Sequence, residues 1–386
     1  MTLPGGIPAW SITSHTALKD LLLDPRVSKD PAQHWSLWRS GALAGNAEAA
    51  WLHSWVGVTN MFTAYGADHR RLRTLIAPAF TARRTTAMVP RVQRITAELL
   101  DALAASAPGA PVDLRTALAH PLPMRVISEL FGIDDPQHAQ ALARLIEKIM
   151  DTTIAPDVAV ATLTEVRTVL GDLVAAKRAN PGDDLTTDLI TARDTDGSTL
   201  TEPELIDTLL LVVGAGHETT VNLIGNAAVG LLTHPEQLAK VQAGDITWDR
   251  VVEETLRWGP SIANLPLRYA VSDIDVQGTV IPAGDAILTS YGAAGWDPAQ
   301  HGPDADRFDL NREPHDHLAF GHGVHRCIGA PLARMEASTA LQALFTRFPH
   351  LHLAGEALPL PPVTSFIAHG WATIPVHLHH RPARRG

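Results

Sequence analysis

The segment from residue 320 to 329 constrains this chain most, because it holds the only cysteine among 386 residues. It reads Phe-Gly-His-Gly-Val-His-Arg-Cys-Ile-Gly, with the cysteine at position 327. Its inner glycines permit a tight turn and a close approach to another group. A helical pattern follows over residues 328–348, so Cys327 stands at a helix N-terminus, where free N–H groups and the helix dipole favour a thiolate. The alternative is an inert core thiol, but a thiolate held this way suits a soft or redox-active metal, haem iron included.

Length and composition narrow the class of protein. A chain of 386 residues, 45% of them hydrophobic, is long enough to enclose a cofactor. We expect residues 1–386 to form one domain, since no linker-like tract or repeat interrupts them. The formal charge of −10 argues against nucleic-acid binding. With no leader or anchor pattern at the start and a single cysteine, we expect a cytoplasmic protein that does not enter a membrane, and a monomer by default.

Apolar residues spaced three or four apart predict a mainly helical chain. The predicted helices span residues 16–23, 68–76, 90–103, 138–150, 157–179, 186–193, 202–232, 248–258 and 328–348. Alternating apolar residues predict strands over residues 274–281, around a Gln-Gly turn, and over residues 286–290. The expected fold class is mainly α, of the α+β type, with a large helical body and a small β-rich side.

The predicted helix over residues 202–232 changes character in its middle. It is apolar nearly all round up to Gly216, which indicates burial, and then Glu218 and Thr219 follow. One interpretation is a kinked core helix whose threonine hydroxyls bond back to backbone carbonyls. The other is a local opening of the helix that admits a diatomic ligand and water, with Thr219 donating a hydrogen bond to the ligand and Glu218 passing protons inward.

These motifs together resemble the cytochrome P-450 family of haem-thiolate monooxygenases. The segment 320–329 is similar to the haem-binding loop of the family, and Ala-Gly-x-Glu-Thr-Thr at residues 215–220 is similar to its oxygen-activation signature. His-x-x-x-Arg at 69–73, Glu-x-x-Arg at 254–257 and an Arg-Phe segment at 307–308 stand in the order of the family. The resemblance runs from about residue 50 to the C-terminus and implies the cytochrome P-450 fold, one mainly helical domain with a small β-rich side.

The resemblance also implies a set of site residues around haem b, that is, iron protoporphyrin IX. Cys327 would be the axial ligand of the iron, and Glu218 and Thr219 would be catalytic. The residues at the cofactor would be His69, Arg73, Ala215, Arg268, Phe320, His325 and Gly329, and the basic ones among them would bind the propionates. Glu254, Arg257 and Arg307 would brace the cysteine loop. Without the resemblance, the residues alone would indicate a weak ion pair on the surface for Glu254 and Arg257. Residues 69–73 would likewise indicate a basic patch exposed to solvent.

A substrate pocket is expected from neutral, mostly apolar residues placed relative to these motifs. They are Val58, Phe62, Leu211, Ala215, Ala263, Leu265, Phe366 and Ile367. Each could equally be ordinary core, but together they make a medium or large apolar molecule the default ligand. Residues 62–66 and 77–80 look like those of soluble bacterial enzymes that tailor macrolides, steroids or cyclic peptides.

The chain departs from the family pattern at two positions. Gly295 and Trp296 stand where Asn-Arg is common, which puts local bracing in doubt. Arg326 stands where an uncharged residue often precedes the cysteine, and adds a positive charge near the sulfur or the docking face for a redox partner.

Three functions follow from the resemblance. The first is monooxygenation, chiefly hydroxylation of an apolar small molecule of natural-product or steroid metabolism. It would use O2 and electrons from a separate ferredoxin-type donor, since no flavin or nicotinamide segment is present. The second is oxidative C–C or C–N coupling of an aromatic or cyclic-peptide substrate by the same oxidant. The third is a haem sensor, against which Glu218 and Thr219 argue, because a sensor needs no proton relay. The sequence does not choose a substrate.

Overall fold

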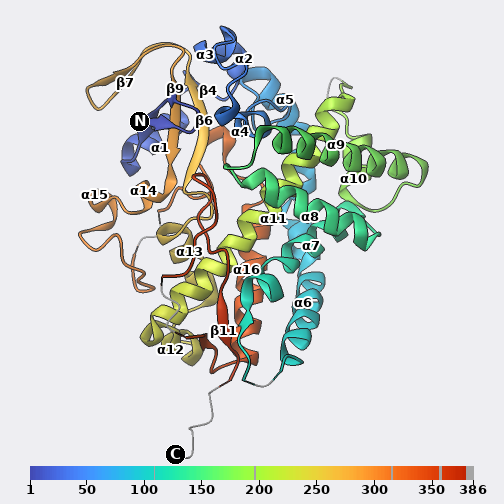
Figure 1. Ribbon diagram of the computed structural model, residues 1–386, viewed down its shortest axis with the longest axis vertical. Helices are drawn as coiled ribbons and strands as arrows, with labels where there is room; N and C mark the ends of the chain where they lie inside the picture. The colour runs from blue at the N-terminus through green and yellow to red at the C-terminus, as the bar shows by residue number, and fades with distance from the viewer. Residues whose placement is uncertain (108, 195–196, 314–315, 356–358, 380–386) are drawn as a thin grey trace, which may run out of the picture.

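Helix α11 (Glu202–Thr233) crosses the middle of the molecule, and the other helices pack around it (Figure 1). Its start is set by a capping box: the Thr201 hydroxyl accepts from the Glu204 N–H, and the Glu204 carboxylate accepts from the Thr201 N–H. This computed structural model describes residues 1–379 except 108, 195–196, 314–315 and 356–358. No helix in those ranges is long and apolar enough to cross a lipid bilayer.

The other helices confirm most of the predicted positions. They are α1 (His15–Leu23), α2 (Pro31–His34), α3 (Ser36–Arg39), α4 (Trp51–Trp55), α5 (Gly66–Ile76), α6 (Ala82–Ala104), α7 (Pro121–Phe131), α8 (Pro136–Met150), α9 (Pro156–Ala179), α10 (Leu185–Thr191), α12 (Pro235–Ala243), α13 (Trp248–Trp258), α14 (Tyr291–Gly295), α15 (Pro298–His301) and α16 (Ala330–Arg347). Single turns of tighter or wider helix cover Ala47–Ala49, Ala77–Phe80, Arg115–Ala119 and Gly323–His325.

The predicted start of α6 at Pro90 is wrong. Proline favours the first turn of a helix, which made residue 90 look like a boundary. The helix instead begins at Ala82, where the Thr81 side chain caps the N–H of Arg84, and Pro90 lies inside it on an exposed face. A proline there costs one backbone hydrogen bond, and the packing of the apolar face of α6 outweighs that cost. The helices that were not predicted are α7 and α12 and the short helices α2, α3, α4, α14 and α15.

The strands form small sheets beside the helical body. The main sheet has the order β3 (Trp10–Ile12), β9 (Ala286–Ser290), β6 (Asn264–Ala270) and β4 (Val27–Ser28). β3 and β9 run parallel, and β6 is antiparallel to both β9 and β4. The predicted hairpin is β7 (Ile274–Val276) and β8 (Thr279–Ile281), joined by Gln277 and Gly278 with positive φ at both.

Over the described stretches of the chain, five more short strands complete the β-rich part. β1 (Thr2–Leu3) pairs with β2 (Ile7–Pro8), and β5 (Val112–Asp113), β10 (His352–Leu353) and β11 (Pro375–His377) form a small separate sheet. None of these was predicted, because two or three residues are too few to show an alternating pattern.

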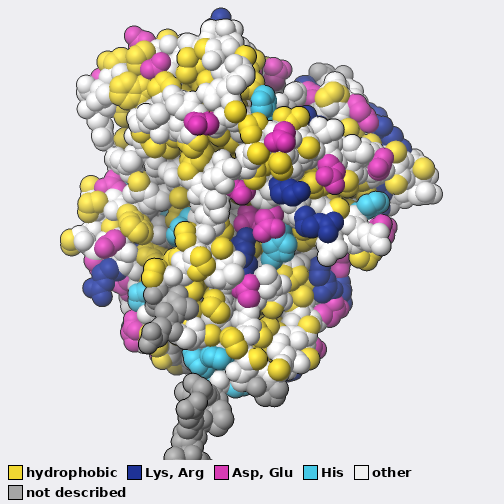
Figure 2. Space-filling model, viewed as in Figure 1, with side chains coloured by type: hydrophobic (Ala, Val, Ile, Leu, Met, Phe, Trp, Pro, Cys, Tyr) yellow, Lys and Arg dark blue, Asp and Glu magenta, His cyan; other side chains and the backbone are white. Residues whose placement is uncertain are grey.

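On the face shown in Figure 2, acidic and basic side chains are interspersed with hydrophobic ones.

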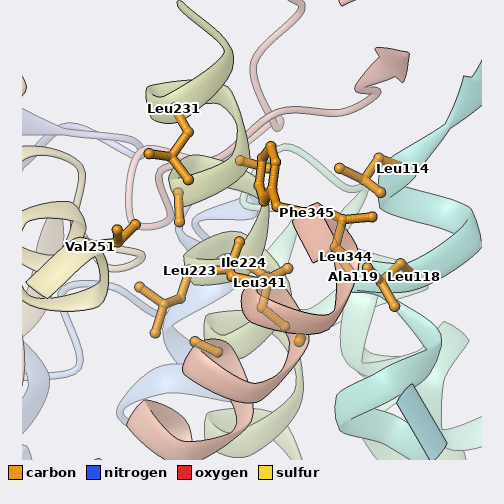
Figure 3. Packing of buried hydrophobic residues seen from close by; sticks show 14 of the residues in the cluster. Leu114, Leu118, Ala119, Leu223, Ile224, Leu231, Val251, Leu341, Leu344 and Phe345 are labelled. Atoms are coloured by element: carbon orange, nitrogen blue, oxygen red, sulfur yellow. The ribbon is translucent and has the colours of Figure 1, made fainter. Parts of the chain in front are cut away.

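Two buried clusters meet along α11. The first joins the C-terminal half of α11 to α6, α13 and α16, and Figure 3 shows its members Ile224 of α11 and Leu341 and Phe345 of α16. The second joins the N-terminal half of α11 to α7, α8, α9 and α10. Because α11 is shared by both clusters, most of its side chains are buried, as predicted, although residues in its middle keep accessible surface on one face.

Candidate functional site

The cysteine loop turns tightly because two of its glycines adopt a left-handed backbone. The φ angle is +67° at Gly321 and +70° at Gly323. A Cβ atom at Gly323 would lie 2.5 Å from the carbonyl oxygen of Leu22, so only glycine fits there. The Cys327 N–H donates to the Phe320 carbonyl oxygen at 2.8 Å and closes the loop. Helix α16 begins at Ala330 with Gly329 as its N-cap, so the prediction of a helix just after Cys327 is confirmed, but its start lies two residues later than expected.

The Cys327 residue keeps surface that solvent can reach. Its thiol nevertheless lies among many protein atoms, which remove it from most of the surrounding water. This burial raises the pKa of the thiol. The N–H groups of Gly329 and Ala330, and more weakly the Arg73 and Arg334 guanidinium groups, act to lower it. The N–H groups at the start of α16 thus act in the predicted direction, but burial of the thiol outweighs them. A bound metal reverses that balance, because coordination displaces the thiol proton.

Four basic side chains predicted at the cofactor come together from three parts of the chain. His69 and Arg73 lie on α5, Arg268 on β6, and His325 in the cysteine loop. The His69 and His325 ring centroids are 4.1 Å apart. Burial, followed by the charges of Arg73 and Arg268, lowers the pKa of His69 to about 4. Burial, followed by Arg268 and His69, also lowers the pKa of His325. Both imidazoles are therefore neutral near pH 7.

This basic cluster fits the anionic edge of a haem. His69 Nε2 and Arg268 Nε are buried and have no hydrogen-bond partner in the part of the chain that the structure describes. Arg73 donates to the backbone carbonyl of Arg326 at 3.0 Å rather than to an acidic side chain. The positive charges of Arg73 and Arg268, gathered at low dielectric, repel one another and stabilise an anion placed between them. Two carboxylates would satisfy these donors, so the residues present fit the predicted cofactor.

One face of α11 stays open in the middle of an otherwise buried helix. Leu211, Ala215 and Thr219 are four residues apart and share this face, and each keeps accessible surface, whereas Val213 and Glu218 are buried. The Thr219 hydroxyl donates to the Ala215 carbonyl oxygen at 2.5 Å, and the helix is unbroken from Glu202 to Thr233. The predicted local opening of the helix is therefore wrong, because the bond back to the preceding turn is made without breaking the helical ladder.

Glu218 is held by an arginine that sequence reasoning missed. Arg115 Nη2 donates to Glu218 Oε1 at 2.7 Å, and Asn222 Nδ2 donates to the same oxygen at 3.2 Å. Arg115 Nη1 also donates to Asn222 Oδ1 at 3.0 Å. All three side chains are buried, and Glu218 Oε2 has no hydrogen-bond partner among the described residues. Arg115 lies far from Glu218 in sequence, and no local pattern marks it as a partner.

Removal of Arg115 should expose the cost of a buried carboxylate. We expect Arg115→Met to lower the free energy of unfolding by about 3 kcal/mol, because Glu218 would be left without its counter-charge. The double variant Arg115→Met/Glu218→Gln should recover part of that loss, since the charge itself is gone. Urea unfolding followed by circular dichroism measures both. Arg347→Met, which removes a surface pair with Asp101, is the control and should cost less than about 1 kcal/mol. Equal losses in the single and double variants would contradict the pairing.

A second buried ionic group lies on α13. Arg257 Nε and Nη2 donate to the two Glu254 carboxylate oxygens at 2.8 and 2.7 Å, and neither side chain has exposed surface. The Asp309 N–H donates to Glu254 Oε1 at 2.8 Å. Arg257 also donates to the backbone carbonyls of Gly295, Ala305 and Arg307. The pair is thus a structural clamp on the segment before the cysteine loop, and the alternative of a weak surface pair is wrong.

The prediction of Arg307 as the third member of this clamp is wrong. The Arg307 side chain is exposed, and only its backbone carbonyl joins the group. Arg312 takes that place: its side chain is 8% exposed, and its Nε lies 3.8 Å from Glu254 Oε1. Arg312 also donates to the carbonyl oxygens of His301 and Asp304. The two arginines are close in sequence, and only the path of the chain between them shows which one turns inward.

The structure shows the surroundings of the two positions at which the chain departs from the family pattern. Gly295 approaches the Arg257 carbonyl so closely that no side chain would fit. Trp296 is half-exposed, and its Nε1 donates at 2.7 Å to the carbonyl oxygen of Trp258, the last residue of α13. The segment at Gly295 and Trp296 is therefore still braced against the end of α13, by the close backbone approach of Gly295 and by the Trp296 hydrogen bond. The Arg326 side chain is exposed beside the cysteine loop.

Segments predicted to line a pocket meet in the structure. Val58 packs in the same buried cluster as Val212 of α11 and Ala368 of the late turn. Phe62, Leu211, Ala263, Leu265 and Phe366 are partly buried, and Ala215 is exposed. Ile367 has no exposed surface and packs with Trp35, Leu267 and Tyr269. A side chain without accessible surface cannot touch a ligand, so the pocket assignment of Ile367 is wrong.

Comparisons with known proteins agree with this geometry. The family model described as Cytochrome P450 matches residues 36–178 and 248–370. The chain is 41% identical to the 2-hydroxy-5-methyl-1-naphthoate 7-hydroxylase of Streptomyces carzinostaticus, over 99% of this chain and 92% of that protein. It is 38% identical to the 6-deoxyerythronolide B hydroxylase of Saccharopolyspora erythraea, over 97% and 91%. The structure of CYP154A1 from Streptomyces coelicolor A3(2) superposes with a TM-score of 0.90 at 50% identity, and the match covers 97% of this chain and 92% of that one.

The cysteine loop, the basic cluster around His69 and the buried clamp at Glu254 thus stand on a backbone shared with solved members of one family. The chain therefore belongs to the cytochrome P450 family, and it is a haem-iron monooxygenase that takes a small-molecule substrate, O2 and electrons from a redox partner.

Proposed function

We propose that this enzyme hydroxylates a medium-to-large apolar small molecule in the cytoplasm, with electrons from a separate ferredoxin-type protein. The observation that carries the proposal is the accessible face of α11, where Leu211, Ala215 and Thr219 stay uncovered within a buried helix. An open, mostly apolar face inside a protein is typical of a small-molecule site. The single cysteine is consistent with a reducing compartment.

The cofactor we propose is haem b. Cys327 would be its axial ligand, and His69, Arg73, Arg268 and His325 would hold its carboxylates. When bound, haem iron activates O2 and supplies the oxidising power for insertion of one oxygen atom into a C–H bond. The basic cluster supports this form of haem, because the donors at His69 and Arg268, which lack a hydrogen bond among the residues that the structure describes, match a porphyrin that carries acidic groups.

Proton delivery falls to Thr219 and Glu218 in this proposal. The Thr219 hydroxyl lies on the accessible face of α11, where it can orient a proton toward a ligand. Glu218 is buried on the neighbouring face, and its Oε2 carries no hydrogen bond in the described part of the chain. Arg115 and Asn222 hold the other oxygen. A carboxylate with one fixed and one free oxygen is suited to accept a proton and release it without losing its position.

The proposed substrate class rests on the pocket and on the relatives. Phe62, Leu211, Ala263, Leu265 and Phe366 offer neutral, apolar surface. One relative is named for a methylated hydroxynaphthoate and another for 6-deoxyerythronolide B. Both names describe molecules with a large hydrocarbon part, and burial of such surface is the main source of affinity in an apolar site.

A ligand screen followed by product analysis tests the proposal. Naphthoic acids, macrolide aglycones and steroids would be screened for the optical shift that accompanies loss of iron-bound water. The best binder would then be turned over with O2 and a ferredoxin system. We expect a product heavier by one oxygen atom. A product lighter by two hydrogen atoms would favour oxidative coupling instead, and tight binding without any product would favour a sensor.

Replacement of Thr219 by alanine should separate electron use from product formation. We expect product per electron pair to fall by at least about tenfold, because a positioned proton donor typically contributes about 10²–10⁴-fold. Thr219→Ser should retain most of the coupling. The control is Thr233→Ala, which removes the same type of hydroxyl bond, here to Val229, from the far end of α11. Unchanged coupling in Thr219→Ala would count against the relay.

A further inference from the structure

Lys29 is a buried lysine that none of the predicted roles uses. It follows β4, whose Ser28 pairs with Tyr269 of the antiparallel strand β6. The next step in the same register places Lys29 opposite Arg268. Residues directly opposite each other in an antiparallel pair project from the same face of the sheet. The ammonium group of Lys29 and the guanidinium group of Arg268 therefore belong to one face.

The surroundings of Lys29 hold other cations and an aromatic ring. Its side chain is only 2% exposed, and Nζ has no hydrogen-bond partner within the described ranges. Nζ lies 3.5 Å from the centroid of the Phe62 ring. Burial, followed by the charge of Arg268, lowers the pKa of Lys29 well below its usual range. Lys29 is also one of the charges that lower the pKa of His325.

This placement is costly unless an anion is present. Lysines near a surface extend the charged end into water, but here the charged end is buried with the stem. Like charges opposite each other on neighbouring strands destabilise the pair, and a buried charge without a partner is more costly still. The Phe62 ring replaces only part of the favourable interaction with water that the ammonium group loses on burial.

We propose that Lys29 and Arg268 form a carboxylate-binding site at the rim of the haem pocket. The carboxylate has two available sources: a propionate of the haem, or an acidic group on a substrate held against Phe62. The inference rests on the proposed haem b for the first source and on the proposed pocket for the second. An ammonium group and a guanidinium group on one face would each donate a charge-assisted hydrogen bond to it.

The first arm of the test measures retention of haem. Ferric holoenzyme would be mixed with excess apomyoglobin, and transfer of haem would be followed by absorbance for the wild type and Lys29→Met. If a propionate is bound, transfer should be about tenfold faster in Lys29→Met, the change expected on loss of one charge-assisted hydrogen bond. Lys29→Gln, which keeps a donor but no charge, is the second variant. Lys240→Met, at an exposed lysine of α12, should match the wild type.

The second arm measures preference for an acidic ligand. Binding of 1-naphthoate and of its methyl ester would be compared by optical titration. If a substrate carboxylate is bound, Lys29→Met should lose about tenfold in affinity for the acid and none for the ester. Unchanged haem transfer together with an unchanged acid-to-ester ratio, in both Lys29→Met and Lys29→Gln, would overturn the proposal. The extracted cofactor would be identified by mass, so that failure of the haem b assignment is seen separately.

Discussion

Cys327→Ser should abolish the red-shifted Soret band that reduced haem-thiolate proteins show with carbon monoxide, and monooxygenase activity with it. A serine hydroxyl is a far weaker and harder ligand than a thiolate, and soft thiolate donors are the ones that tune haem iron for O–O cleavage. The chain contains no second cysteine that could take over. We therefore expect loss to the background level rather than a partial decrease.

Two measurements keep this prediction separate from simple misfolding. Circular dichroism of Cys327→Ser should retain the helical signal, because the thiol is not part of either main buried cluster. Val324→Ala serves as the matched loop variant, since this side chain is exposed in the same loop, and its band should be unaffected. An intact red-shifted band in Cys327→Ser would contradict Cys327 as the axial ligand.

Arg257→Met should produce the largest loss of stability of any single change considered for this protein. The substitution leaves Glu254 charged and fully buried, and it also removes the donors to three backbone carbonyls. Breaking a buried ion pair from one side costs about 3–5 kcal/mol, and unsatisfied buried carbonyls add to that cost. We expect little folded holoenzyme at 37 °C and a large drop in the unfolding midpoint at lower temperature.

The matched control for this prediction is a surface pair of the same chemistry. Arg178 and Glu202 form a bidentate pair with both side chains about half-exposed. Arg178→Met should therefore cost less than about 1 kcal/mol. Arg312→Met is expected to lie between the two variants, because Arg312 also reaches Glu254 but at 3.8 Å. Similar midpoints for Arg257→Met and Arg178→Met would show that the clamp on α13 does not stabilise the fold.

The motifs with strong local requirements were predictable from the sequence. Gly321 and Gly323 are needed for a left-handed turn and a close approach, and the structure shows both. The spacing of Glu254 and Arg257 on one helix face is also a local property, and their pair forms as the spacing allows. The β7–β8 hairpin follows from Gln277 and Gly278 at a two-residue turn. In each case the determining interaction lies within a few residues.

Other features depend on which distant segments meet. Glu218 has its partner at Arg115, the charge of Arg268 acts on the buried Lys29, and Arg312 rather than Arg307 turns toward Glu254. Thr219 reads from sequence either as a back-bonded core residue or as a residue at an opened helix. The unbroken ladder of α11, held between two buried clusters, decides for the closed helix.

The amino-acid sequence by itself determined the ligand-bearing loop, the order of the motifs and the mainly helical class, because glycine conformation, helix periodicity and residue chemistry act over a few neighbouring residues. Only the tertiary structure decided how the buried charges pair and which side chains keep accessible surface. Those outcomes depend on the packing of segments that lie far apart along the chain, and the high cost of an unpaired charge at low dielectric selects one arrangement among several that the sequence allows.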